Sequence, residues 1–197
     1  MIRTGTANLA SVAAAFERAG QPIRISTDPA DAESASRVVL PGVGAFGPVA
    51  DRLDELRLRE VLAARIAAGR PTLAICLGLQ LLAEASEEDP GARGLGVLPA
   101  TVTAIGEGLR VPHLGWNHVA AGATCSLLED GDAYFANSFK LDDVPAGWAG
   151  ATTDHGGPFV AALERGAVLA CQFHPELSGS WGEALLRRWL GEEVPPC

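Results

Sequence analysis

The fold class follows from one stretch, Thr72-Leu-Ala-Ile-Cys76-Leu-Gly78-Leu-Gln80-Leu-Leu-Ala83. Residues 72–75 form a short apolar run that predicts a buried strand, and helical spacing then continues from Leu79 to Ala85. Cys76 lies at the turn between them, as in a nucleophile elbow, where backbone N–H groups and the helix dipole favour the thiolate. The alternative is a buried cysteine in an ordinary βα unit, because free cysteine is among the most buried residue types. This stretch alone leaves both alternatives open.

The length and charge of the chain limit what it can be. It has 197 residues, 48% of them hydrophobic and 20% charged, which suits a globular domain with a substantial core. The net charge of −9 argues against a nucleic-acid partner, which would require a basic surface. No linker or repeat interrupts the pattern. We therefore predict a single α/β domain over residues 1–197.

The cysteines and the N-terminus bear on metal sites and on location. The cysteines (Cys76, Cys125, Cys171 and Cys197) are widely spaced without a CxxC pair, which argues against a zinc site or a disulfide framework. The first residues lack the basic and then apolar pattern of a signal peptide. No apolar run approaches the ~18 residues of a membrane span. We expect a cytoplasmic protein with no bound metal and no membrane contact.

The order of the elements predicts the sheet. Three strands alternate with helices up to about residue 85, which indicates a parallel sheet covered on both faces. Strands expected to be antiparallel follow, and then a last buried strand at 168–173 and a closing helix at 181–190. The earlier expected elements are helices at 9–19 and 49–68 and strands at 23–25, 37–40, 95–98, 101–105, 133–136, 148–152 and 159–163.

Two further segments could serve a nucleophile. His174-Pro175-Glu176 follows the last strand, at the carboxyl edge where ligands bind in open α/β sheets. The Glu176 carboxylate could orient the His174 imidazole and stabilise its cation, although a lone histidine is more often structural. Pro41-Gly42-Val43-Gly44 follows another strand, and its backbone N–H groups can face a ligand, although such clusters are more often plain turns.

Four segments in this order resemble the class I (triad) glutamine amidotransferases, and more narrowly the glutaminase subunit of imidazole glycerol phosphate synthase. They are Pro41-Gly-Val-Gly-Ala-Phe46, Ile75-Cys-Leu-Gly-Leu-Gln80, Val111-Pro-His-Leu-Gly-Trp-Asn117 and Gln172-Phe-His-Pro-Glu176. The resemblance covers nearly the whole chain. It implies a flavodoxin-like fold with a central, mostly parallel sheet, flanking helices and added antiparallel strands.

The resemblance also implies the roles of individual residues. Cys76 would attack the carboxamide of L-glutamine, His174 would transfer the protons, and Glu176 would orient His174. The backbone N–H groups of Val43 and Leu77 would form the oxyanion hole. The residues implied to bind glutamine are Gly42, Gly44, Gln80, Ser138 and Phe139. No metal or cofactor is implied.

The ammonia formed would be used by a second polypeptide. The chain contains no Gly-x4-Gly-Lys phosphate loop and has no room for a synthase domain. In the resembled family the partner is a (β/α)8-barrel cyclase, bound as a heterodimer, that makes imidazole glycerol phosphate and aminoimidazole carboxamide ribotide for histidine biosynthesis. Asn8, Trp116 and Asn117 match positions that face this partner. Core packing for Trp116 and helix capping for Asn8 are the alternatives.

Several residues depart from the family pattern. Arg3-Thr-Gly-Thr-Ala-Asn8 replaces the usual Asp-Tyr-Gly-x-Gly-Asn, Asn137 replaces a histidine, Phe139 a tyrosine, and Leu177 a lysine that pairs with an acid on the cyclase. These departures keep three alternatives open. They are a paralogous amidotransferase subunit, for example in surface-sugar biosynthesis, a catalytically retired regulatory subunit, and a stand-alone cysteine hydrolase.

Overall fold

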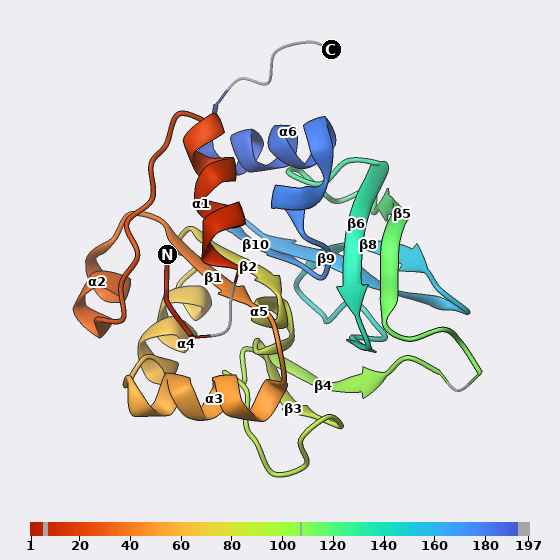
Figure 1. Ribbon diagram of the computed structural model, residues 1–197, viewed down its shortest axis with the longest axis horizontal. Helices are drawn as coiled ribbons and strands as arrows, with labels where there is room; N and C mark the ends of the chain where they lie inside the picture. The colour runs from red at the N-terminus through yellow and green to blue at the C-terminus, as the bar shows by residue number, and fades with distance from the viewer. Residues whose placement is uncertain (6–7, 107, 193–197) are drawn as a thin grey trace.

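The computed structural model describes residues 1–5, 8–106 and 108–192. A seven-stranded sheet with the order β1-β2-β10-β9-β8-β5-β6 runs through the molecule, with helices on both of its faces (Figure 1). Three residues discussed above, Thr6, Ala7 and Cys197, lie outside the described part of the chain. The predicted α/β class is confirmed.

Three parallel strands form one side of the sheet. They are β1 (Val38–Gly42), β2 (Thr72–Cys76) and β10 (Val168–Cys171), and every residue in them is buried. Continuous apolar sequence is expected for strands covered on both faces. The register places Gly42 beside Cys76. The segment of residues 41–44, called the glycine loop below, and the cysteine therefore leave the sheet at the same edge.

Antiparallel strands extend the sheet beyond β10. They are β9 (Pro158–Arg165), β8 (Ala149–Asp154), β5 (His113–Ala121) and β6 (Gly131–Asn137). Neighbouring β5 and β6 pair along their whole length, from His113 opposite Asn137 to Val119 opposite Gly131. The predicted addition of antiparallel strands is therefore confirmed. The two-stranded ribbon of β5 and β6 ends at Asn137, near the glycine loop.

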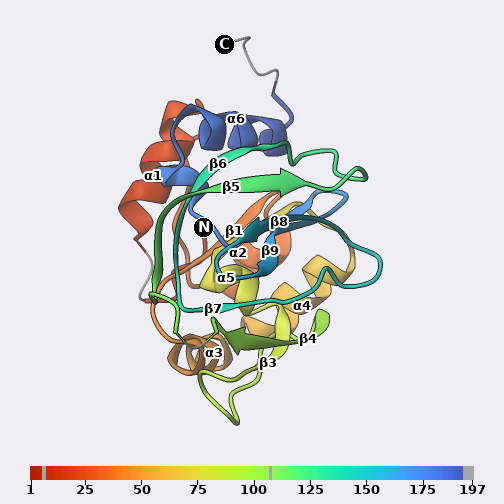
Figure 2. The ribbon, with the colours of Figure 1, turned by 90° about the vertical axis from the view of Figure 1, so that its right-hand side faces the viewer.

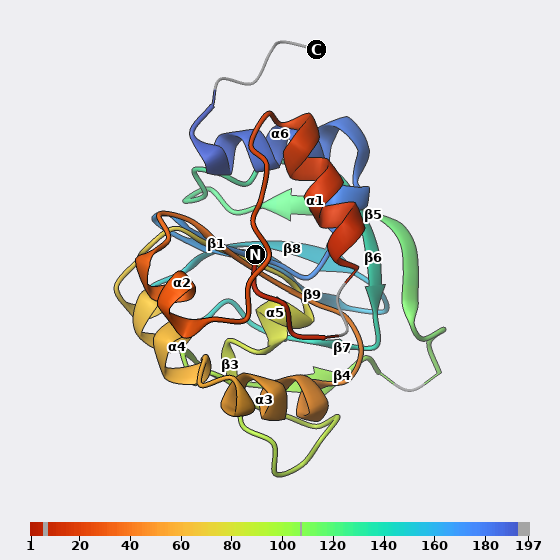
Figure 3. The same cartoon turned by 60° about the vertical axis from the view of Figure 1, so that its left-hand side comes forward.

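The helices form two layers. On one face lie α1 (Leu9–Arg18) and α6 (Gly179–Leu190), and on the other α3 (Phe46–Glu55), α4 (Arg59–Ala67) and the short α5 (Leu77–Gln80) (Figures 1 and 3). Each layer buries its own apolar cluster against the sheet. The first is built around Phe16, Leu185 and Trp189, and the second around Phe46, Leu53, Leu62 and Ile66. No described helix is long and apolar enough to cross a membrane.

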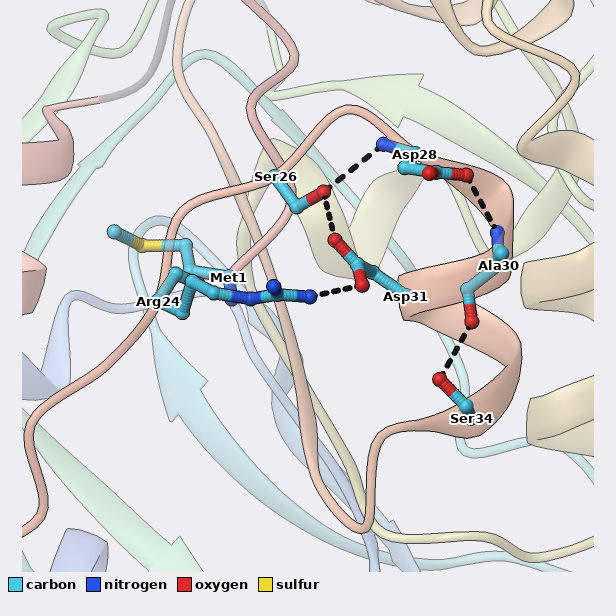
Figure 4. A network of polar contacts seen from close by, with 7 residues as sticks. All are labelled: Met1, Arg24, Ser26, Asp28, Ala30, Asp31 and Ser34. Carbon is cyan, nitrogen blue, oxygen red and sulfur yellow. Dashed lines mark hydrogen bonds and ion pairs between the residues drawn. The ribbon is translucent and has the colours of Figure 1, made fainter.

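The N-terminal edge differs from the sequence prediction. The strand expected at 23–25 is reduced to one parallel bridge between Ile2 and Ser26. Polar contacts hold this segment instead, because Ser26 and Arg24 both donate to the Asp31 carboxylate in α2 (Pro29–Ser34) (Figure 4). The amino group of Met1 donates to the Arg24 carbonyl at 2.7 Å.

Two helices also differ from the predicted boundaries. The helix expected at 49–68 is broken at Arg57, whose φ is +55°, yet Leu53, Leu58 and Leu62 on both sides of the break are fully buried. The apolar spacing continues across the break, so periodicity could not reveal it. After Cys76 the helix ends at Gln80, and the chain enters a strand.

A second, three-stranded sheet accounts for that change. It has the order β3-β4-β7, with β3 (Ala83–Ser86), β4 (Leu98–Ala104) and β7 (Phe139–Lys140) (Figure 2). β3 pairs in parallel with β4, and this pairing ends the helix that was predicted from the apolar run. β4 replaces the two strands expected at 95–98 and 101–105, and β7 places Phe139 beside the main sheet's edge.

Arg65 ties α2, α4 and β2 together. It is 2% exposed, and its guanidinium donates to the carbonyl oxygens of Ala32, Ala35, Ser36 and Pro71 and to Oγ1 of Thr72. All of these acceptors are uncharged. Burial, with the nearby charge of Arg70, lowers the pKa of Arg65 to about 10, so the side chain remains a cation at neutral pH.

Replacing Arg65 by leucine is expected to lower the free energy of unfolding by about 3 kcal/mol, because several buried acceptors lose their donor. Urea denaturation followed by circular dichroism measures this. Arg52→Leu is the control, since Arg52 only forms an exposed ion pair with Glu55 and should change the value by less than ~0.5 kcal/mol. A loss below about 1 kcal/mol for Arg65→Leu would contradict the assigned role.

Candidate active site

Cys76 lies on a strained turn at the end of β2. Its φ is +55° and its ψ is −112°, and α5 begins at the next residue. A positive φ is uncommon for a residue with a Cβ and is often found at functional sites. The structure therefore contains the predicted strand, sharp turn and helix, and Cys76 is one of two described non-glycine residues with a positive φ.

Two glycines allow this turn to pack against β1. A Cβ on Gly78 would lie 2.1 Å from the Leu40 carbonyl oxygen, and one on Gly42 would lie 2.9 Å from the Leu77 Cβ. Neither position has room for a side chain. Gly44, at the end of the glycine loop, has a φ of +99°, which glycine adopts without strain.

His174 and Glu176 form a buried pair beside the cysteine. Nδ1 of His174 lies 2.9 Å from Oε1 of Glu176, and the side chain of His174 is near enough to Cys76 for the cysteine to raise the pKa of His174. The backbone also holds the imidazole in place, because the His174 N–H donates to the Tyr134 carbonyl at 2.9 Å and the Ser178 hydroxyl donates to the His174 carbonyl at 2.7 Å. Side chains arranged in this way can act as a nucleophile, a base and an orienting acid.

The surroundings of His174 favour its cation. Burial by itself lowers the pKa of His174, but the hydrogen bonds and charges of Cys76 and Glu176 outweigh burial and raise the pKa to about 10. The site therefore favours an imidazolium at His174, between the side chains of Cys76 and Glu176. A thiolate is the form of cysteine that attacks carbonyl carbon.

A cavity of about 250 Å³ opens beside the cysteine. It is lined by Val43, Gly44, Cys76, Leu77, Gln80, Glu88, Ala136, Asn137, Ser138, Phe139 and His174. Two of the residues named from the sequence are not in its lining: Gly42 supports the turn from behind, and Glu176 lies behind His174. Segments that follow or end β1, β2, β6, β7 and β10 thus meet at one edge of the two sheets. The cavity between them is large enough to hold a small molecule.

Gln80 already has protein partners in this cavity. Its amide nitrogen donates to the Phe139 carbonyl and to Oε1 of Gln172, each at 3.0 Å. The amide nitrogen of Gln172 in turn lies 3.7 Å from the Cys76 sulfur. A chain of polar groups therefore leads from the nucleophile to the wall formed by β7.

Gln172 and Glu88 are site residues that the sequence analysis missed. Gln172 is fully buried, and a polar residue at the end of an apolar strand just before His174 was an available signal. Glu88 accepts a hydrogen bond from the Phe46 N–H at 2.9 Å and lines the cavity. It lies in the acidic run Glu87-Glu88-Asp89, whose composition is that of a solvated turn, so no sequence signal marked it as a site residue.

The residues expected at the partner surface differ in exposure and in contacts. Trp116 is 59% exposed, which excludes core packing for its ring. Asn117 points to the opposite face of β5, as successive strand residues do, and its amide donates to the Asp154 carbonyl at 2.7 Å. Asn8 caps α1, accepting from the Ser11 N–H at 3.4 Å. In residues 1–5, 8–106 and 108–192, no group of three acidic, histidine or cysteine side chains could hold a metal ion.

Comparison with known proteins gives one consistent family. The model of the class I glutamine amidotransferase family matches residues 6–191. Imidazole glycerol phosphate synthase subunit HisH of Methanothermobacter thermautotrophicus is 41% identical, over 96% of each chain. The same subunit of Aquifex aeolicus is also 41% identical, over 96% of this chain and 94% of the relative. The chloroplastic imidazole glycerol phosphate synthase hisHF of Arabidopsis thaliana is 39% identical over 97% of this chain, which spans 33% of that protein.

Solved structures give the same fold. A crystal structure of a glutamine amidotransferase superposes with a TM-score of 0.77 at 20% identity, over 96% of both chains. The PurLQS structure from Thermotoga maritima contains a chain with a TM-score of 0.76 at 17% identity, over 96% of this chain and 95% of that one. At such low identity the likeness concerns the fold alone.

Replacing Glu176 by glutamine is expected to lower the pKa of His174 by about 1 to 3 pH units, because the imidazolium loses an adjacent negative charge. A titration of the imidazole signals by nuclear magnetic resonance measures it. Glu183→Gln is the matched control, since Glu183 pairs with Arg187 on α6 and should leave the titration unchanged. An unchanged His174 titration in Glu176→Gln would show that Glu176 does not stabilise the cation.

Proposed function

Because the chain belongs to the class I glutamine amidotransferases, and within them to the family of imidazole glycerol phosphate synthase subunit HisH, we propose that it is the glutaminase subunit of such a synthase. As one amidotransferase domain over residues 1–197, it hydrolyses L-glutamine to glutamate and ammonia in the cytoplasm. The ammonia passes to a (β/α)8-barrel cyclase subunit for histidine biosynthesis. The observation that carries this proposal is the contact of Cys76, His174 and Glu176 at the edge of a small-molecule cavity.

The reaction would proceed through a thioester. The Cys76 thiolate adds to the side-chain carbonyl carbon of glutamine, and the oxyanion is held by the backbone N–H groups of Leu77 and Val43. Each such donor is usually worth about 3 kcal/mol in activation free energy. His174 gives its proton to the leaving nitrogen, and ammonia departs. His174 then takes a proton from the water that attacks the thioester. This step releases glutamate and free Cys76.

The far end of the cavity suits the amino-acid end of glutamine. The Glu88 carboxylate lines the cavity and can bind the α-ammonium group. Ser138 and Phe139 place backbone groups on the same wall, where they can contact the α-carboxylate and α-ammonium groups. Gln80, hydrogen-bonded to that wall, would complete the site together with the glycine loop at Gly42 and Gly44.

An apolar surface beside the cavity supports a protein partner. We name it the mouth surface, and it consists of Leu114, Trp116, Tyr134 and Ala136 on one face of the β5–β6 ribbon together with Leu177. Leu114 is 63%, Trp116 59% and Leu177 42% exposed. Trp116 pairs with Tyr134 and Leu114 with Ala136, which itself lines the cavity. Exposed apolar groups gathered at one place mark an interaction site.

The mouth surface also bears on the alternatives. A stand-alone hydrolase would have no use for exposed apolar side chains around its cavity, and a retired subunit would not need the buried His174–Glu176 pair. Identity of about 40% along the full length with histidine-pathway subunits favours that pathway over a paralogous one. With Leu177 in place of a lysine, docking at this point would rest on apolar contact rather than on an ion pair. Asn8 and Asn117 would contribute at most indirectly, as a helix cap and as a support for β5.

Cys76→Ala is expected to abolish glutamine-dependent synthesis of imidazole glycerol phosphate in the complex with the cyclase, because the nucleophile is lost. The ammonium-dependent reaction should stay within about twofold of wild type, since the barrel supplies that chemistry. Both rates are measured with purified subunits. Glutamine-dependent turnover that survives Cys76→Ala would exclude the proposed mechanism.

Trp116→Ala is expected to weaken binding of the cyclase at least tenfold, because a truncated central tryptophan typically costs about 2 kcal/mol. Isothermal titration calorimetry with the cyclase measures this. His118→Ala is the matched control, since His118 lies on the same face of β5 farther from the cavity and makes an exposed contact with Asp132. Equal affinities for the two variants would remove the mouth surface from the interface.

A further inference from the structure

The cavity wall formed by β6 and β7 is held from behind by a buried polar pair that takes no part in the chemistry above. Asn137 ends β6 and lines the cavity, and His113 begins β5 directly opposite it. They are 4% and 5% exposed. Burial of a polar group costs free energy unless the group is hydrogen-bonded. The presence of two such side chains here therefore has to be explained by their contacts or by their role.

The first link runs from Asn137 to the nucleophile. The Asn137 amide donates to the Phe139 carbonyl at 3.0 Å, and the Gln80 amide donates to the same oxygen at 3.0 Å. Gln80 continues to Gln172, whose amide faces the Cys76 sulfur. The Phe139 carbonyl is therefore the point at which Asn137 meets the groups around the nucleophile, and its two donors fix the direction in which it points.

The second link joins Asn137 to His113. Oδ1 of Asn137 and Nδ1 of His113 are both buried, and neither has a hydrogen-bond partner in the described part of the chain. One is an acceptor and the other a potential donor, and their residues lie directly opposite each other on β6 and β5. The Asn137 side chain also raises the pKa of His113 by a smaller effect than the others. The larger effects are burial and the neighbouring His155, and both lower that pKa, so His113 is neutral at pH 7.

The surroundings of His113 assign its proton. Asn117 places its amide nitrogen, a donor, 3.2 Å from Nε2 of His113, and the same amide is anchored on the Asp154 carbonyl. Nε2 is therefore the acceptor, and the proton of the neutral ring is on Nδ1, toward Asn137. The rings of Phe135 and His155 stack on the imidazole with centroids 4.9 and 4.3 Å away, which prevents it from turning.

We propose that Asn137 and His113 are positioning residues that hold the Phe139 carbonyl, and through it Gln80 and Gln172, in the arrangement that receives glutamine. The inference rests on the proposed function, because it concerns the affinity of that same site. It also gives a role to Asn137, which stands where the family has a histidine. Either side chain can accept from His113 and donate to the Phe139 carbonyl at once.

The test uses the full chain and two alkylating reagents, with modification of Cys76 followed by mass spectrometry. The first, 6-diazo-5-oxo-L-norleucine, is a glutamine analogue and reports on the binding site through the concentration at half-maximal rate. The second, iodoacetamide, does not need that site and reports on the cysteine alone. Asn137→Asp is nearly isosteric and turns the donor toward the Phe139 carbonyl into an acceptor. It is expected to raise the half-maximal concentration of the analogue about tenfold, with the iodoacetamide rate within about twofold of wild type.

Two further variants separate positioning from structure. Asn137→His should restore the half-maximal concentration to within about threefold of wild type, and His113→Phe, which keeps the stacking and removes the Nδ1 proton, should raise it about fivefold. Thr153→Val is the control, since it also removes a buried polar group without a hydrogen-bond partner in the described part of the chain. It should leave the half-maximal concentration of the analogue and the iodoacetamide rate unchanged. If Asn137→Asp does not fold, His113→Phe decides alone.

The outcomes are distinct. Asn137→Asp and His113→Phe with wild-type half-maximal concentrations overturn the inference and leave the proposed function in place. Equal losses with both reagents also overturn it, because they indicate a structural role only. A wild-type protein that reacts with iodoacetamide but never saturates with the glutamine analogue overturns the proposed function and this inference together.

Discussion

The positive φ of Cys76 is the constraint on which the rest of the site depends. It turns the chain from β2 into α5 within one residue, and it is possible only because Gly42 and Gly78 allow the turn to lie against β1. The backbone strain costs of order 1–3 kcal/mol, and the close packing of three buried parallel strands offsets it. The sulfur is thereby fixed at the same edge of the sheet as His174, which follows β10. A side chain at either glycine would separate nucleophile and base.

The parts of this site that the sequence predicted are those encoded locally. A strand, a cysteine and a glycine in succession determine the elbow, and His174 and Glu176 are separated by one rigid proline, so their contact needs no distant partner. The parallel order of β1, β2 and β10 follows from alternating strands and helices. Family resemblance added residues 138–139 and the oxyanion role of the loop at residues 41–44. That these segments meet Cys76 depends on the whole topology.

What the sequence did not reveal is set by contacts between distant segments. The Arg57 break is hidden because Leu53, Leu58 and Leu62 keep the same apolar spacing across it. The strand β3 forms from a run with helical spacing because β4 is available to pair with it. Gln172 and Glu88 become site residues only when β10 and the segment after β3 reach the cavity. Acidic residues in a turn otherwise signal only solvent exposure.

Arg65 has a consequence for the conditions that the fold tolerates. Its acceptors are four backbone carbonyls and one hydroxyl, none of which gains or loses a proton between acidic and neutral pH. The ion pair of Arg24 with Asp31, by contrast, ends when that carboxylate is protonated, and salt screens it. The attachment of α2 and α4 to β2 should therefore persist in dilute acid and at high ionic strength after the surface ion pairs have gone.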